Sequence, residues 1–265
     1  MLKYIVMLVV LFLAFMTNLW LGIAVTVILV GYTLYKAVPS LYAAQGNKAF
    51  SDGDMAGARK WYRKAYDTGR ASLNLKTGYG ILLMRLGAYE TAETVFNEII
   101  LDKSIPKDKK NNPKQYRALL YYKLGRPADA LEEAEELFEG YRNSTMYGLL
   151  GYLKLATGQP IDETLDFCLE AYDYNADDRD IQDNLVLAYY KKGQYDKAKE
   201  YADQLAEAHP QFVEAMYHSA LIALALGDRD GAKAFAEKIS GCKRTGLTTI
   251  SEAEVEELKN TLGMA

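Results

Sequence analysis

Histidine and cysteine are scarce in this sequence, and their scarcity excludes several kinds of site. The 265 residues include only two of each. Cys168 and Cys242 cannot build a disulfide framework, so we interpret them as thiols in a reducing compartment. His209 and His218 have no partner at metal-ligand spacing and no obvious acid-base partner. We therefore expect neither a metal site nor a catalytic dyad.

A nucleotide-binding loop is also missing. Gly78-Tyr79-Gly80 begins like a dinucleotide-binding motif, but the third glycine and a preceding strand are absent. Paired acids such as Asp177 and Asp178 are common on solvated helix faces. The sequence predicts a protein that is not an enzyme and holds no cofactor.

The charges are distributed unevenly along the chain. The formal net charge is −4, yet residues 1–126 contain 18 Lys and Arg against 8 Asp and Glu. A basic half favours contact with anionic lipid, at about 1 kcal/mol per basic residue near the surface. The sequence pI of about 5.4 and the lack of a nucleic-acid module predict no nucleic-acid partner.

A long apolar run occupies residues 4–35. It has no charged residue, and its clearly polar side chains are Thr17, Asn18, Thr26 and Thr33. The run exceeds the roughly 18 apolar residues that indicate a membrane-spanning helix. It is also longer than the apolar core of a signal peptide, so we expect it to be retained. We predict a membrane anchor over residues 1–36.

Two geometries fit this anchor. As a single helix the run would reach roughly 48 Å, whereas a hydrocarbon core is about 30 Å thick. One strongly tilted helix is therefore the first alternative. A helical hairpin that turns at Thr17 and Asn18, with short spans over 2–16 and 19–35, is the one we favour. Because Lys36 and Lys48 follow the run, the positive-inside rule places the rest of the chain on the cytoplasmic side.

A regular series of glycines follows the anchor. Six glycines recur at intervals of 33 to 38 residues: Gly53, Gly87, Gly125, Gly158, Gly193 and Gly227. Such a period indicates a solenoid of short helices. Small residues such as Gly46 and Gly80 lie seven positions before a glycine of the series, and aromatic residues such as Tyr62 and Phe96 lie nine positions after one. This spacing indicates two helices that pack closely, with the periodic glycine ending the first.

The pattern resembles the tetratricopeptide repeat. The best copy contains Leu185, Tyr189, Gly193, Ala198 and Pro210. The resemblance covers about 39–246 and implies an all-α, right-handed superhelical solenoid of about six helix-turn-helix units. The expected units are 39–72, 73–106, 111–144, 144–177, 179–212 and 213–246. We expect residues 247–265 to add a C-terminal capping helix, which opens with a capping box at Ser251 and Glu254.

In this family the first helix of each unit lines a concave groove. Carrying that property to the matching positions gives a candidate peptide-binding groove of Asn47, Phe50, Met84, Arg85, Tyr122, Lys123, Tyr152, Tyr190 and Lys191. Such a lining suits a peptide with apolar side chains and a carboxylate. The alternative is that the tyrosines pack between helices while the cations are solvated. Members that clamp a chaperone tail need five polar groups, of which only Asn47 is present, so we do not expect that ligand.

These features combine into one hypothesis and one rival. The sequence favours a membrane-anchored scaffold that binds a protein or peptide in its groove at the cytoplasmic face. The rival is a non-cytoplasmic envelope protein that organises a surface or cell-wall assembly machinery. An enzyme decorated with repeats is a third possibility, but the anchor and the repeats leave no segment large enough to contain it.

Overall fold

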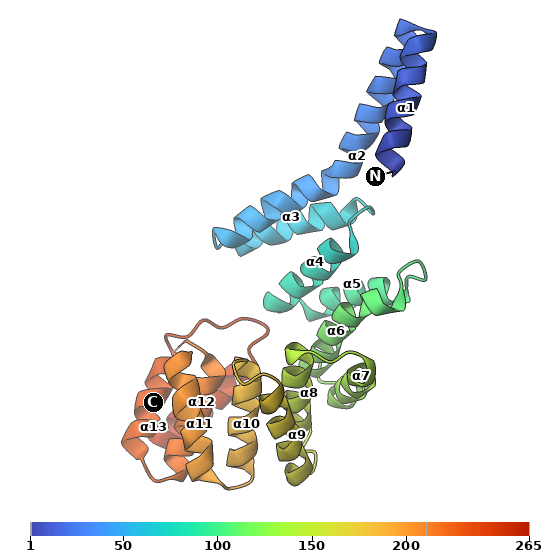
Figure 1. The fold of residues 1–265 in the computed structure, drawn as a ribbon. Coiled ribbons are helices and arrows are strands. Elements are labelled where there is room, and N and C mark those ends of the chain that lie inside the picture. The colour runs from blue at the N-terminus through green and yellow to red at the C-terminus, as the bar shows by residue number, and fades with distance from the viewer. Residues whose placement is uncertain (1, 210, 265) are drawn as a thin grey trace. The chain divides into compact units, whose positions relative to one another are not determined.

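The structure is a computed structural model that describes the backbone of residues 2–209 and 211–264, with side chains from Ile5 onward. The predicted closing proline, Pro210, lies outside the described residues. Within the described ranges the regular elements are all helical (Figure 1). They are α1 (Leu2–Thr17), α2 (Leu19–Ser51), α3 (Met55–Asp67), α4 (Leu73–Arg85), α5 (Tyr89–Leu101), the 3-10 helix η1 (Lys107–Lys110), α6 (Asn111–Lys123), α7 (Pro127–Gly140), α8 (Ser144–Ala156), α9 (Ile161–Tyr174), α10 (Arg179–Lys191), α11 (Tyr195–Ala208), α12 (Val213–Ala225), α13 (Arg229–Ile239) and α14 (Glu252–Leu262).

The chain divides into two compact units, Met1–Tyr79 and Gly80–Ala265. The division falls inside α4. We describe each unit by itself.

The first unit begins with two apolar helices that pack against each other. Asn18 separates α1 from α2, and its side chain accepts a hydrogen bond of 2.8 Å from the backbone nitrogen of Trp20. Close packing follows this turn, because a Cβ atom added at Gly22 would lie 2.2 Å from Cδ1 of Phe15. The chain therefore forms a helical hairpin here.

Helix α2 continues from the apolar run into the first repeat. We expected a boundary between residues 36 and 39, but α2 has 33 residues and contains Pro39. Figure 1 shows that α2 bends along its length. Proline accounts for a bend because it lacks one helical hydrogen-bond donor and its ring crowds the preceding turn. Lys48, Ala49 and Phe50 then lie in the last turn before α3.

The periodic glycines end the first helix of each repeat. Each of the six has a positive φ, between 71° at Gly87 and Gly158 and 82° at Gly227. Residues with a Cβ rarely adopt this left-handed conformation, and glycine adopts it without steric strain. The sequence prediction that a left-handed residue terminates these helices is confirmed.

The small residues let large aromatic rings cross the first helix. A Cβ atom added at Gly46 would lie 2.5 Å from Cδ2 of Tyr62. One added at Gly80 would lie 2.7 Å from Cζ of Phe96, whose side chain is fully buried. Close helix packing therefore explains the glycines seven positions before the series.

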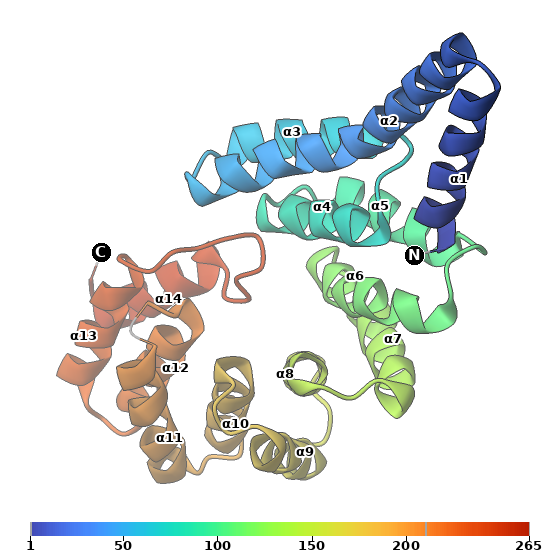
Figure 2. The ribbon, with the colours of Figure 1, turned by 45° about the horizontal axis from the view of Figure 1, so that its top comes forward.

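In the second unit the helix pairs follow one another from α5 to α13 and end on α14 (Figure 2). Buried apolar side chains form two clusters, one centred on α7 and α8 and one that extends from the end of α8 to α14. The predicted capping box is present, because Ser251 and Glu254 exchange both hydrogen bonds at the start of α14. Val255, Leu258 and Leu262 bury the inner face of α14 in the larger cluster.

Candidate functional site

Two residues of the predicted groove belong to the first unit. Asn47 is exposed, and its side-chain oxygen accepts a short hydrogen bond from the hydroxyl of Tyr62. Phe50 is 40% exposed, which is high for a phenylalanine. Both side chains are accessible, although the amide of Asn47 is already held by the second helix of its own repeat.

The residues of the second unit divide into exposed and buried ones. Arg85 and Lys191 are exposed at the ends of α4 and α10, and Tyr190 is half-buried with its ring centroid 5.5 Å from that of Tyr195. Met84 is 0% exposed. Its side chain is therefore not accessible to a partner in this structure, and its neighbours Leu82 and Leu83 are buried as well.

Three groove residues, Tyr122, Lys123 and Tyr152, lie on α6 and α8. The rings of Tyr122 and Tyr152 meet edge to face, with centroids 5.2 Å apart. Burial raises the pKa of Tyr152, and the neighbouring Tyr122 adds to the shift. Burial also lowers the pKa of Lys123, against the attraction of the Glu214 carboxylate. All three side chains are half-buried, so they are less accessible than the wall of an open groove.

Lys123 binds the loop between α13 and α14, which spans residues 240–251, and we call residues 241–250 of this loop the C-terminal strap. Figure 2 shows this loop reaching from α13 and α14 toward α6. Its tip is a β-turn in which the Thr248 nitrogen donates to the Thr245 carbonyl at 3.0 Å. The Thr245 nitrogen also donates to the Thr248 hydroxyl at 3.1 Å, which closes the turn from the other side.

Gly246, at the tip of the strap, binds the second repeat through its main chain. Its nitrogen donates to the Arg85 carbonyl at 2.9 Å, and its carbonyl accepts from the Tyr89 hydroxyl at 2.8 Å. A Cβ atom at this position would lie 2.1 Å from the Met84 oxygen and 2.9 Å from the Gly87 nitrogen. Because those atoms are backbone, the site admits only glycine here.

The other side of the strap binds the third and sixth repeats. The ammonium of Lys123 donates a short hydrogen bond to the carbonyl of Thr248. The nitrogen and the hydroxyl of Thr249 both donate to one oxygen of Glu214, at 2.7 and 3.0 Å. The strap therefore contacts three repeats that are far apart in the sequence.

Sequence reasoning missed this contact. The signal that could have revealed it was the length of the connection, because residues 240–251 separate α13 from α14 whereas residues 175–178 separate α9 from α10. Long loops in compact proteins are often functional. The groove positions carried over from the family gave no indication that the chain itself covers some of them.

The structure also corrects the expectation that His218 has no acid-base partner. Its Nδ1 lies 2.7 Å from a carboxylate oxygen of Asp183, which is 35 residues earlier and occupies the preceding repeat. Burial acts to lower the pKa of His218, but the Asp183 carboxylate more than offsets this and the pKa is raised. The two side chains are 6% and 9% exposed, so the pair lies inside the protein, where a substrate does not reach it.

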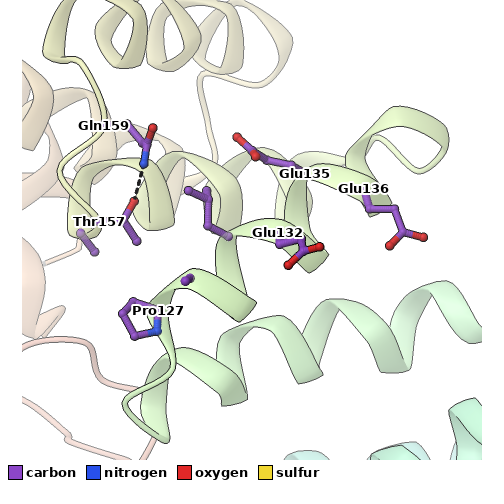
Figure 3. Close-up of a pocket in the computed structure, with 9 residues that line it drawn as sticks. Pro127, Glu132, Glu135, Glu136, Thr157 and Gln159 are labelled. Carbon is purple, nitrogen blue, oxygen red and sulfur yellow. Dashed lines mark hydrogen bonds between the residues drawn. The ribbon is translucent and has the colours of Figure 1, made fainter.

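A shallow pocket of about 770 Å³ lies between α7 and the end of α8 (Figure 3). Leu131 and Pro127 supply its apolar part, and three glutamates surround it: Glu132, Glu135 and Glu136. Glu135 is paired with Lys154 at 2.9 Å. In the part of the chain that the structure describes, no group of three or more metal-ligating side chains could hold a metal ion. The pocket is therefore partly apolar and bordered by acidic side chains.

Comparisons with known proteins agree with the repeat architecture. The tetratricopeptide repeat family model matches residues 184–240. A tetratricopeptide repeat protein from Parabacteroides merdae is 16% identical with a TM-score of 0.59, and 86% of each chain is covered. PilF of Pseudomonas aeruginosa is 15% identical with a TM-score of 0.58, over 86% of this chain and 99% of that one. PilW, described as a widely conserved type IV pilus biogenesis factor, is 19% identical with a TM-score of 0.55, over 73% and 87%. No curated protein matches the sequence.

These similarities confirm the predicted all-α tetratricopeptide-repeat fold. At such identities they establish the fold alone.

Proposed function

We propose that this tetratricopeptide-repeat protein is a membrane-anchored scaffold that holds a protein or peptide partner at the cytoplasmic face of a membrane. Proteins with this fold are generally interaction modules without catalytic chemistry. The observation that carries the proposal is the contrast between an exposed apolar hairpin and a solenoid with a well-packed core.

The hairpin supports the anchor. Among the described helices, α2 alone is long and apolar enough to cross a membrane, with a mean hydropathy of 1.8 over its most apolar window, of which 6% is buried. Trp20, Val27 and Ile28 are each at least 65% exposed. Side chains of this kind are unfavourable in water and favourable in lipid. We infer that α1 and the first half of α2 enter the bilayer together, which requires local thinning because both spans are short.

Basic and aromatic side chains follow the apolar part of α2. The guanidinium of Arg70 lies 3.6 Å from the ring centre of Tyr35, and the ammonium of Lys64 lies 4.7 Å from that of Trp61. Aromatic side chains are enriched at the membrane interface, and cations there attract anionic headgroups. We propose that this part of the first unit contacts lipid, as the basic amino-terminal half suggests.

The side of the membrane is the finer part of the proposal. Lys36 and Lys48 favour the cytoplasmic side by the positive-inside rule. The alternative is an envelope protein of a surface assembly machinery, and the similarity in fold to the pilus biogenesis factor PilW favours it. Labelling of an engineered cysteine separates the two.

For this test we combine Glu256→Cys, at an exposed position on α14, with Cys242→Ser. Cys168 is 0% exposed, so we expect it not to react with the label. On the cytoplasmic side, the introduced thiol reacts with an impermeant maleimide only after cells are opened. Labelling of intact cells would establish the envelope alternative instead.

Partner binding by the exposed groove cations is tested with a pair of charge reversals. Arg85→Glu with Lys191→Glu should abolish capture of a partner from native membranes. Lys199→Glu with Lys233→Glu, on the second helices of the fifth and sixth repeats, is the matched control and should leave capture unchanged. If the two double variants capture the partner equally well, the partner does not use this face.

A further inference from the structure

The strap is held by more specific contacts than a simple connection needs. An ordinary loop requires only that its ends be joined, and most connections between helices in this chain are short. Here one glycine binds the second repeat by both main-chain groups, and the next threonines bind Lys123 and Glu214. Donors and acceptors from three repeats converge on one turn, which is the arrangement of a binding site.

We propose that the concave face of the second unit contains a binding site for a β-turn segment of the type Thr-Gly-x-Thr-Thr, and that the strap occupies this site in the same chain. The site consists of the Arg85 carbonyl, the Tyr89 hydroxyl, the Lys123 ammonium and the Glu214 carboxylate. A partner segment with the same turn competes with the strap. The inference rests on the proposed function, since it assigns the partner chemistry and the regulation of the same groove.

The contacts define what the site recognises. Glycine is required at the tip, because any Cβ there meets the backbone oxygen of Met84. A residue with a hydroxyl is favoured three positions later, where Glu214 accepts from both the nitrogen and the hydroxyl of Thr249. The nitrogen of Leu247 donates to the Thr245 hydroxyl within the turn, not to the site, so that position tolerates other residues.

The strap competes strongly because it is tethered. A short tether gives a segment an effective concentration on the order of millimolar at its own site. An external turn of equal intrinsic affinity therefore binds poorly while the strap is seated. A variant that unseats the strap should bind such a turn much more tightly.

The test uses the full chain in detergent micelles and a labelled synthetic peptide of residues 240–251 with serine in place of Cys242. Gly246→Ala unseats the strap, because its Cβ cannot be accommodated. Gly241→Ala is the matched control in the same loop, since a Cβ there meets nothing closer than 3.5 Å. By fluorescence polarisation, we expect the peptide to bind the Gly246→Ala protein at least tenfold more tightly than the wild type or the Gly241→Ala protein.

Three further measurements make the result specific. A peptide with alanine in place of Gly246 should bind none of the proteins. Adding Glu214→Gln to the Gly246→Ala protein should weaken peptide binding at least fivefold. Tyr89→Phe removes one hydrogen bond to the strap without crowding the backbone, and it should accelerate amide hydrogen exchange at Gly246 and Thr249 while the circular dichroism of the helices is unchanged.

Absence of saturable peptide binding to the Gly246→Ala protein up to about 1 mM would overturn the proposed site. Equal binding to all three proteins would do the same, because it would place the peptide away from the strap. If partner capture still depends on Arg85 and Lys191 in that case, the scaffold proposal stands and only this inference fails. If capture is independent of those residues and the peptide nevertheless binds, the site exists and the proposed partner surface is wrong.

Discussion

The first half of α2 and the whole of α12 are both apolar, yet their surroundings are opposite. Helix α12 buries Val213, Met216 and Ile222 among neighbouring repeats, with at most 2% of each side chain exposed. In α2, Val27 and Ile28 are 65% and 69% exposed. Composition alone does not distinguish a core helix from a membrane helix, because both bury the same kinds of side chain.

Length and neighbours supply the distinction. Helix α12 has 13 residues and reaches about 20 Å, which is too short to cross a hydrocarbon core of about 30 Å. It lies within a series of helices that all contribute to one apolar cluster. The apolar part of α2 packs against α1 and leaves most of its surface exposed, and this is the surface that we propose a bilayer covers. The repeats therefore bury their apolar side chains against one another, whereas the hairpin leaves most of its apolar side chains exposed.

The largest expected effect is a loss of stability when a buried side chain of α12 is truncated. Ile222→Ala removes a side chain that is 1% exposed, and such a change usually destabilises a protein by about 2–5 kcal/mol. Ile28→Ala is the matched control and should leave the unfolding of the repeats unchanged. Thermal unfolding of the detergent-solubilised chain, followed by circular dichroism, compares the two. Equal shifts in the unfolding midpoint would show that α2 is also packed in a protein core.

A charged residue introduced into α2 tests whether the apolar part of this helix lies in a membrane. Ile28→Arg should weaken membrane association by about 2.5–3.5 kcal/mol, the usual penalty for arginine near the centre of a spanning helix. Gln45→Arg, farther along the same helix on an exposed position, should have no such effect. Flotation of membranes on a density gradient measures the bound fraction. A bound fraction that stays the same in the Ile28→Arg variant would mean that this segment does not enter the bilayer.

Regular features of the fold could be predicted from the sequence because they are local and repeated. The period of the glycines fixes where a left-handed residue must end a helix, and each of the six has a positive φ. The spacing of Gly46 to Tyr62 and of Gly80 to Phe96 follows from two helices crossing within one repeat. The capping box of α14 uses Ser251 and Glu254, which are three residues apart, so it too is readable.

Contacts between distant repeats could not be predicted from such local sequence patterns. The approach of Gly246 to Arg85 depends on the accumulated curvature of the intervening repeats, which no short pattern encodes. Met84 was assigned to the groove by its position in the repeat, but its side chain is 0% exposed. His218 and Asp183 lie in successive repeats at neighbouring positions of the first helix, so their pairing could have been found by comparing successive units.

Gly31 and Gly46 allow the exposed and the packed parts of α2 to be compared within one helix. A Cβ at Gly31 would meet nothing within 4 Å, whereas one at Gly46 would lie 2.5 Å from the ring of Tyr62. Gly31→Ala should therefore be neutral or slightly stabilising, because alanine favours the helix by about 0.5–1 kcal/mol. Gly46→Ala should destabilise the first unit by about 1–3 kcal/mol through overpacking.

The measurement is hydrogen exchange of α3, which packs on Gly46 through Tyr62. Exchange in α3 should become faster in Gly46→Ala and stay as in the wild type in Gly31→Ala. Faster exchange in both variants would indicate that α2 responds as one rigid element, and the proposed difference between its two halves would be lost.

The smallest effect concerns a buried pair that α12 has and the apolar part of α2 lacks. The carboxylate of Asp183 raises the pKa of His218 in the folded protein. A raised folded pKa stabilises the fold fully below the unfolded value of about 6.5, and this contribution is lost as the pH rises through the folded pKa. The slope for one proton is at most about 1.4 kcal/mol per pH unit.

Urea unfolding of the full chain between pH 5 and 9 should show this loss, and His218→Gln should remove it while still filling most of the space. The matched control is His209→Gln, because His209 lies in the turn after α11 and should leave the pH dependence intact. A pH dependence that survives His218→Gln would assign the titration to another group. In that case the pair would act in α12 only as a satisfied hydrogen bond inside the core.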